Sequence, residues 1–268
     1  MFYICNMKKI LFLSVALLAV LACNFVIAAP GKHIKGNGVK VEKSFDMAPF
    51  DAVRLNGSFD VVFTQGPQKV VLSADENLID VFKVEVRDGA LCLGIERGTG
   101  FSTRNKVVFT VSSHELNAVK VNGSGDFKVR NVLDSDNLSL SINGSGDIEA
   151  DTIECKNLNC NINGSGDIEV DALSAASADV KINGSGDVLL VCREVREVTA
   201  TVNGSGDVDL YGNIVSVASK VRGSGEVKTH KGVFPTDDGQ SGRQQNRGAR
   251  FRHPCLFNRR RSVSCLAR

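Results

Sequence analysis

The stretch N-G-S-G-D at residues 143–147 is one of six copies of a short motif that organises the second half of the 268-residue chain. Successive copies begin 21, 20, 20, 20 and 19 residues apart. A regular period of this length is typical of a solenoid in which each coil contributes about twenty residues. The other copies begin at Asn122, Asn163, Asn183 and Asn203, with a variant, R-G-S-G-E, at Arg222.

Apolar and polar residues alternate around each copy. Because a period of two is typical of β-strands, and no helical period interrupts the following coils, we predict an all-β fold. The specific architecture that we expect is a right-handed parallel β-helix, whose narrow apolar interior is buried only when coils stack. In residues 138–150 the predicted inward set is Leu138, Leu140, Ile142, Gly144, Gly146, Ile148 and Ala150.

The two glycines of each copy are predicted to form a corner of the coil. Glycine adopts positive φ at low cost and has no Cβ to crowd a bend. The flanking Asn and Asp side chains can hydrogen-bond backbone groups in turns. We prefer this structural interpretation to a ligand site, and also to glycosylation of N-G-S, because glycans one coil apart would clash. The corner glycines are Gly123, Gly125, Gly144, Gly146, Gly164, Gly166, Gly184, Gly186, Gly204, Gly206, Gly223 and Gly225.

The two ends of the chain differ from its body. Residues 1–28 are predicted to be a signal peptide, since Lys8 and Lys9 precede an apolar run that is short for a transmembrane helix. Ordinary cleavage after Ala28 competes with a lipoprotein site, in which Cys23 would be acylated and would hold the protein at a membrane. We therefore expect an extracytoplasmic protein that is in the periplasm, on the outer-membrane surface or secreted.

Residues 235–268 contain eight arginines, no lysine and two aspartates. We interpret them as a disordered Arg-rich tail that is either frameshifted or a basic arm for anionic lipids. Without this tail, residues 1–234 carry 24 basic and 28 acidic residues. This mildly acidic body argues against a nucleic-acid partner, which would require clustered basic surface.

Cysteine spacing gives no sign of a metal centre. Four cysteines lie outside the signal peptide and the tail, and C-x-x-C does not occur. Cys160 falls at an inward position, where a free thiol behaves as a small apolar residue. We expect no metal cluster, no dense disulfide framework and no cofactor.

The first half of the chain is also predicted to be rich in strands. Gly66-Pro67 and Asp88-Gly89 supply turns. N-G-S-F-D at residues 56–60 is a degenerate copy of the motif, so this half is expected to start the same solenoid and to add hairpins that project from it or cap it. The predicted strands are 39–45, 52–55, 60–64, 69–73, 81–87, 90–96 and 106–112.

Several stretches of the first half, followed by the G-S-G-D coils, carry a family resemblance. Together they resemble the head GIN domain family, which is described as auto-transporter adhesins and as a domain of unknown function. The resemblance covers roughly residues 44–232 as a single domain, with the G-S-G-D coils at 116–232. It implies a pectin lyase-like β-helix and adhesion at the envelope of Bacteroidetes-type bacteria. The stretches are F-D-A-V at 50–53, G-S-F-D-V at 57–61, T-Q-G at 64–66, A-D-E-N-L at 74–78 and K-V-E-V at 83–86.

One acidic residue per coil should form an outward column about 24 Å long. Neighbouring carboxylates would repel by about 0.9 kcal/mol in bulk water, so backbone N–H groups, the motif serines or water must screen them. A calcium column is the alternative, although each coil supplies one carboxylate and calcium takes six to eight oxygens. The column is Asp126, Asp147, Asp167, Asp187, Asp207 and Glu226.

We expect a non-enzymatic protein that binds a polysaccharide or an envelope or host surface protein. The alternative is a polysaccharide-acting enzyme, because carboxylates one coil apart approach the spacing of a retaining glycosidase pair. Catalysis requires two carboxylates in different environments, whereas this column is uniform, so no catalytic residue is predicted. If a ligand surface lies in the first half, we expect it in the glycine-rich loop Gly98 to Arg104, with Phe101 at its tip.

Overall fold

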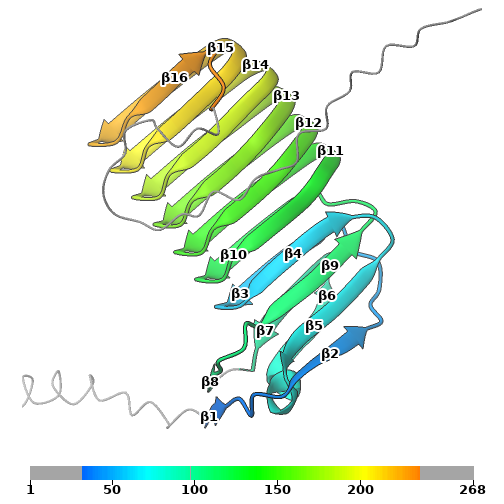
Figure 1. The fold of residues 1–268 in the computed structure, drawn as a ribbon. Coiled ribbons are helices and arrows are strands. Elements are labelled where there is room, and N and C mark those ends of the chain that lie inside the picture. Colours follow the sequence, from blue (N-terminus) through cyan, green and yellow to red (C-terminus); the bar gives the residue numbers. More distant parts are fainter. Residues whose placement is uncertain (1–31, 97, 236–268) are drawn as a thin grey trace, which may run out of the picture.

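The computed structural model describes residues 32–96 and 98–235, so the predicted signal peptide and nearly all of the Arg-rich tail lie outside the described residues. The described part is nearly all β and forms a stack of parallel coils of about 20 residues, with about six turns. Figure 1 shows this stack rising from a set of shorter strands at its N-terminal end. The predicted all-β solenoid is confirmed.

Each complete coil is one long strand that bends around the solenoid between two motif copies. These coils are β11 (Phe127–Gly144), β12 (Ile148–Gly164), β13 (Ile168–Gly184), β14 (Val188–Gly204) and β15 (Val208–Gly223), and the last partial coil is β16 (Val227–Lys231). The shorter strands are β1 (Lys32–Lys35), β2 (Lys40–Phe45), β3 (Ala52–Gly57), β4 (Asp60–Gln65), β5 (Lys69–Asp75), β6 (Phe82–Arg87), β7 (Ala90–Ile95), β8 (Thr99–Ser102), β9 (Val108–Ser113) and β10 (Ala118–Gly123).

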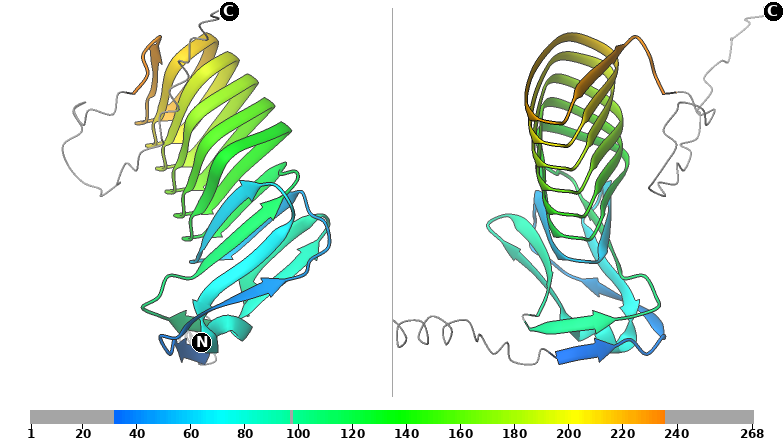
Figure 2. Two further views of the ribbon diagram at one scale, coloured as in Figure 1. Left: turned by 45° about the vertical axis from the view of Figure 1, so that its right-hand side comes forward. Right: turned by 90° about the vertical axis from the view of Figure 1, so that its left-hand side faces the viewer.

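The coils stack in register, so that equivalent side chains become vertical neighbours. Ile142 pairs with Ile162, which pairs with Ile182, which in turn pairs with Val202. None of these four side chains has any solvent exposure. Burial of a side chain of this size contributes about 1.5 to 3 kcal/mol, and here it depends entirely on the neighbouring coil. The right-hand view of Figure 2 shows the coils as rings stacked one above another around this common interior.

The glycines of the motif allow the backbones of successive coils to approach closely. Gly164, the first glycine of its copy, has φ +146°, a value that L side chains rarely adopt. Gly166, the second glycine, has no such φ, but a Cβ there would lie 2.0 Å from the carbonyl oxygen of Gly146 in the coil below. The same contact recurs in every coil from Gly125 to Gly225. The second glycine is therefore required by the close approach of successive coils and not by its φ angle.

The first half of the chain starts the solenoid and closes its end. β3 pairs in parallel with β10, with Asn56 opposite Asn122, so the degenerate motif copy is indeed the first coil. β6 and β7 form an antiparallel hairpin, and β5 pairs antiparallel with β2 and β9. Phe59 stands where later copies have their second glycine, and its ring packs 5.4 Å from Phe82 and 5.2 Å from Phe109. The predicted capping hairpins are confirmed.

Three short features of the first half were not predicted. β1 pairs in parallel with β8, and a 3-10 helix, η1 (Glu76–Val81), occupies the start of the strand predicted at 81–87. The prediction that Phe101 stands at the tip of a ligand-binding loop is wrong. Phe101 belongs to β8, and its ring centroid lies 5.4 Å from that of the buried Phe82. Phe101 is partly buried and packs against the apolar core at this end, so it is not a free tip.

The buried carboxylate of Asp75 links the segment between β1 and β2 to the loop that follows β8. Asp75 is fully buried, and its carboxylate accepts hydrogen bonds from Thr103 Oγ1 at 2.7 Å, Asn105 Nδ2 at 2.5 Å and the Gly38 backbone N–H at 3.3 Å. The bonds from Thr103 and Asn105 hold the pKa of Asp75 below its ordinary value. The ionised form is therefore the one that the fold uses.

Substituting the second glycine of a central coil tests the stacking requirement. We expect Gly166→Ala to lower the free energy of unfolding by about 3 kcal/mol or more, since the added methyl group overlaps a backbone carbonyl that cannot move independently. Ser165→Ala is the matched control, because Ser165 is exposed and should change stability by less than about 0.5 kcal/mol. Urea denaturation measures both, and equal midpoints for the two variants would contradict the stacking account.

Candidate functional site

The motif acids form a ladder of hydrogen bonds that links successive coils. Each carboxylate accepts a bond from the backbone N–H of the acidic residue one coil further on; Asp147 Oδ1, for example, accepts from the Asp167 N–H at 2.9 Å. Backbone N–H groups are thus one of the screening groups expected for this column. The bonds run from Asp60 through Asp126, Asp147, Asp167, Asp187 and Asp207 to the N–H of Glu226, with distances of 3.4, 3.3, 2.9, 2.8, 2.7 and 2.9 Å.

Burial affects the ladder carboxyls as well. Desolvation raises the pKa of Asp126 and of Asp147 above the ordinary value, and neighbouring carboxylates raise it further. The backbone N–H bonds act in the opposite direction, because they favour the ionised form. The ladder therefore contributes backbone hydrogen bonds, at the cost of holding like charges one coil apart.

An asparagine ladder runs beside the acidic one. The side-chain Nδ2 of each motif asparagine donates to Oδ1 of the asparagine in the preceding coil, and Arg222 stands where the next member would be. The partners that the sequence suggests for these amides are nearby backbone groups, whereas in the structure identical amides at one-coil spacing bond to each other. The pairs are Asn56 with Asn122, Asn122 with Asn143, Asn143 with Asn163, Asn163 with Asn183, and Asn183 with Asn203, at 2.8, 3.0, 3.1, 2.9 and 3.0 Å.

A broader acidic surface lies next to the ladder, on the side of each coil that follows the motif. We define the acidic side as the ladder carboxylates together with the outward residues of the following strand segments. Carboxylates occupy these positions in β12 and β13, the apolar Leu189 and Val191 follow in β14, and cations lie at both ends. Two positions after each motif copy, the paired residues are Lys128, Glu149, Glu169, Leu189, Asp209 and Lys228. Four positions after it stand Arg130, Asp151, Asp171, the buried Val191, Tyr211 and His230.

Ion pairs neutralise the two ends of the acidic side. Lys128 Nζ lies 2.6 Å from a Glu149 carboxylate oxygen, and an Arg130 guanidinium nitrogen lies 2.8 Å from Asp151. At the other end, Lys228 Nζ lies 2.8 Å from Glu226. Such partly exposed pairs each contribute about 0 to 1 kcal/mol to stability. They leave the negative charge concentrated between them.

Glu169 and Asp171 form the centre of the acidic side. Within residues 32–96 and 98–235, neither carboxylate has an ion pair. Burial is the largest cause that raises the pKa of Glu169 and of Asp171, followed by neighbouring carboxylates. Both side chains are only partly exposed, so a bound cationic group would relieve their repulsion and replace lost hydration.

Aromatic rings occur at the C-terminal end of the acidic side. The rings of Tyr211 and His230 stack at a centroid distance of 4.3 Å, and His230 Nε2 lies 3.6 Å from Asp209 Oδ1. This arrangement continues the columnar packing of the coils, since Tyr211 and His230 pair directly in β15 and β16.

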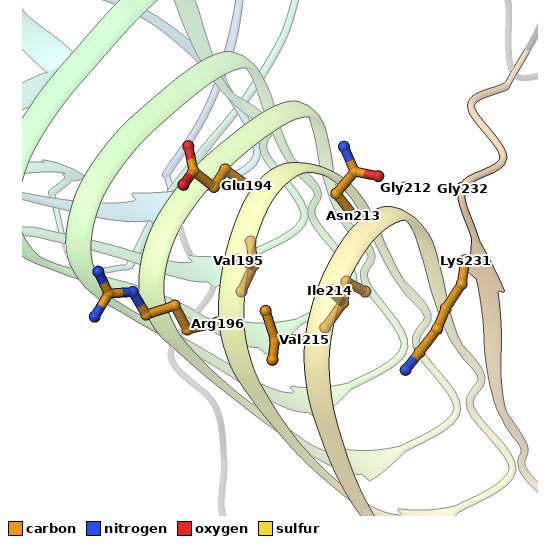
Figure 3. A pocket seen from close by; sticks show the side chains of 9 residues that line it. All are labelled: Glu194, Val195, Arg196, Gly212, Asn213, Ile214, Val215, Lys231 and Gly232. Atoms are coloured by element: carbon orange, nitrogen blue, oxygen red, sulfur yellow. The ribbon is translucent and has the colours of Figure 1, made fainter.

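The concave features that we find in the described part lie on another side of the coils and are shallow. One depression, of about 510 Å³, crosses several coils and includes Glu154, Cys155 and Lys156. The second, of about 370 Å³, lies at the C-terminal end, and Figure 3 shows Glu194, Arg196 and Lys231 on its open rim. Burial raises the pKa of the Cys155 thiol to about 11, so this thiol is protonated and is a poor nucleophile near neutral pH.

The described ranges contain no group of three or more His, Cys, Asp or Glu side chains that could hold a metal ion. The acidic residues of the ladder are spaced one per coil, and each of the first six offers an oxygen to a backbone N–H.

Cys92, Cys155, Cys160 and Cys192 are free thiols, and Cys160 is buried in the core at the inward position predicted for it. Nor does any helix in residues 32–96 and 98–235 have the length and apolar character needed to cross a membrane.

Sequence reasoning located the motif column but missed the centre of the acidic side. Glu169 and Asp171 are not part of the repeated motif, and their columns change from coil to coil. Reading positions two and four after each motif copy, rather than the motif itself, would have found them.

The two roles of a ladder aspartate can be separated by substitution at Asp147. We expect Asp147→Ala to lower the free energy of unfolding by about 1 to 3 kcal/mol, because it leaves the Asp167 N–H without its acceptor. Asp147→Asn retains an acceptor and removes a desolvated charge, so its stability at pH 7 should equal or exceed that of the wild type. Chemical denaturation at pH 7 measures this order, and a larger loss for Asn than for Ala would contradict it.

Removal of calcium should leave the fold unchanged. Because the ladder bonds already link its carboxylates to backbone N–H groups, we expect the same melting temperature in EDTA and in millimolar calcium, measured by circular dichroism. A melting temperature that rises with calcium concentration, and returns after chelation, would instead support the calcium column.

Comparisons with known proteins agree with this architecture. The family model described as "Putative auto-transporter adhesin, head GIN domain" matches residues 49–232. No curated protein matches the chain. Among solved structures, a putative adhesin from Bacteroides fragilis is 21% identical, with a TM-score of 0.59, over 73% of this chain and 99% of its own.

Two further structures come from Parabacteroides distasonis. A putative adhesin is 22% identical, with a TM-score of 0.56, over 74% of this chain and 100% of its own. A protein titled as a putative lipid binding protein is 23% identical, with a TM-score of 0.54, over 75% of this chain and 99% of its own. At these identities the likeness concerns the fold, whereas the family match spans most of the chain. This protein belongs to the head GIN domain family of auto-transporter adhesin-like proteins.

Proposed function

We propose that the protein is an exported, non-enzymatic adhesin of the cell envelope, which binds a polysaccharide or an envelope or host surface protein through the acidic side of its solenoid. The observation that carries this proposal is the placement of carboxylates at one-coil spacing over an open surface, with cations only at the two ends. A repeated array binds a repeating or extended partner through many weak contacts, so that avidity replaces a single deep site.

Two further findings support a binding role over catalysis. The depressions on the molecule are shallow, whereas sites for small substrates are generally enclosed clefts. The ladder aspartates all accept the same kind of backbone N–H bond, which gives each of them a structural role, whereas general acid and base roles require two carboxylates in unlike environments. Membership of an adhesin-like family agrees with both findings.

Export is supported by the sequence and by the family. The predicted signal peptide at residues 1–28 and the adhesin-like family both favour an envelope or extracellular location. Acylation of Cys23 would add a membrane anchor, and the lipid-binding title of one P. distasonis neighbour concerns that protein. We propose that this chain contacts a membrane only through such an anchor.

The acidic side is tested by neutralising its centre without touching the ladder. Glu169→Gln and Asp171→Asn should each weaken retention of the purified protein on its polymer by about threefold, and the double variant should weaken it by about tenfold, because each carboxylate contributes a fraction of a kcal/mol. Asp179→Asn is the matched control, since Asp179 is an exposed acid of the same coil on the side that precedes the motif. Its retention should equal that of the wild type.

The assay uses immobilised envelope and host polysaccharides, and it scores both retention and the release of reducing ends. Graded loss of retention, with no release of reducing ends, is the expected outcome. Release of reducing ends that disappears with a single substitution would contradict the proposal and favour the polysaccharide-acting enzyme. Equal loss in the Asp179→Asn control would show that the acidic side is not the binding surface.

A further inference from the structure

The C-terminal end of the solenoid has an unpaired strand edge. β16 pairs with β15 only over residues Val208 to Gly212. The later part of β15, Ser216–Gly223, pairs with β14 on one side, and no described strand pairs with it on the other. Its outward-pointing N–H and C=O groups therefore form a template for one more strand. Figure 1 shows β16 beside only one portion of β15 at this end.

The apolar interior is also incomplete at this edge. Val221 is 39% exposed and Val217 is partly exposed, whereas their partners in β14, Val202 and Val198, are fully buried. In every lower coil a following strand covers these positions. A strand laid on Ser216–Gly223 with apolar residues at alternate positions would close the interior in the same way.

Two cations project from the opposite face of this edge. Lys220 and Arg222 are exposed and make no ion pair within residues 32–96 and 98–235. Arg222 stands at the position of the asparagine ladder, directly after Asn203. An added strand would place its outward residues beside these two side chains, so acidic residues would be favoured there.

Neither the next residues of this chain nor a second copy of it fits the edge well. The residues that would follow in register, 236–243, read T-D-D-G-Q-S-G-R and contain no apolar side chain to cover Val217 and Val221. A second copy could pair its own Ser216–Gly223 with this edge. In each copy, however, β16 already lies beyond the first part of β15, in the place that the other copy would need, so the two copies would clash.

We propose that Ser216–Gly223 is a docking edge for an extended segment of another polypeptide, in which apolar residues alternate with acidic ones. The segment adds one strand, donates and accepts backbone hydrogen bonds along β15, and places its acidic residues beside Lys220 and Arg222. This site is separate from the acidic side, and it does not depend on the proposed polymer binding.

The probe is the synthetic peptide acetyl-TVEVEVTG-amide, which is titrated into the full chain and followed by amide chemical shifts and hydrogen exchange. We expect saturable binding, with exchange protection gained at the amides of Ser216–Gly223. The peptide acetyl-TVKVKVTG-amide should bind about tenfold more weakly, and the protein variant Lys220→Glu/Arg222→Glu should reverse this preference.

Lys181→Glu is the matched control, because Lys181 lies in the same outward column as Lys220 but on β13, which is paired on both sides. It should leave both peptide affinities unchanged. All substituted side chains are exposed, and the melting temperature of each variant confirms that it folds.

Three results would overturn the proposal. The first is the absence of saturable binding by either peptide to the folded protein. The second is protection of Ser216–Gly223 in the free full chain that disappears when residues 236–268 are removed, which would show that this chain covers its own edge. The third is a dimer, measured by light scattering, that Lys220→Glu dissociates, which would make the edge a contact between copies.

Discussion

The contact between the backbones of successive coils at the second glycine of each motif sets the geometry of the whole solenoid. At Gly166 a Cβ would lie only 2.0 Å from the carbonyl oxygen of Gly146, so the two coils meet without any side chain between them. This contact repeats from coil to coil and fixes the register at that column. With the register fixed, the isoleucines pack on one another inside and the polar residues align outside.

Alignment of identical polar residues has two consequences that act in opposite directions. For asparagine it is favourable, because an amide is both donor and acceptor and pairs with its copy. For aspartate it brings like charges together, and backbone N–H groups compensate only in part, as the raised pKa of Asp147 shows. The ladder is thus chiefly structural. In the neighbouring columns, Glu169 and Asp171 make no ion pair within residues 32–96 and 98–235, and these are the carboxylates that we propose for binding.

The periodic part of the fold could be predicted from the sequence, because in a solenoid each position has one neighbour above and one below. The stacking of Ile142 on Ile162 follows directly from the motif spacing. The strands that close the N-terminal end could be predicted only in part. The contact of Phe101 with Phe82 and the hydrogen bonds to Asp75 join segments that lie outside the repeat, so no sequence period predicts them. The candidate site was harder still, because the centre at Glu169 and Asp171 depends on which coils have cations, and that differs from coil to coil.

Removal of one whole coil tests the account most directly. Deleting residues 168–187 removes twenty residues and would place β12 directly beneath β14, with glycine again above glycine. The account predicts that this shortened chain still unfolds cooperatively and retains its β-sheet circular dichroism, with a lower free energy of unfolding, whereas deletion of residues 168–177 alone, half a coil, prevents folding. If the twenty-residue and ten-residue deletions abolished folding alike, the coils would not be interchangeable units, and the account would be contradicted.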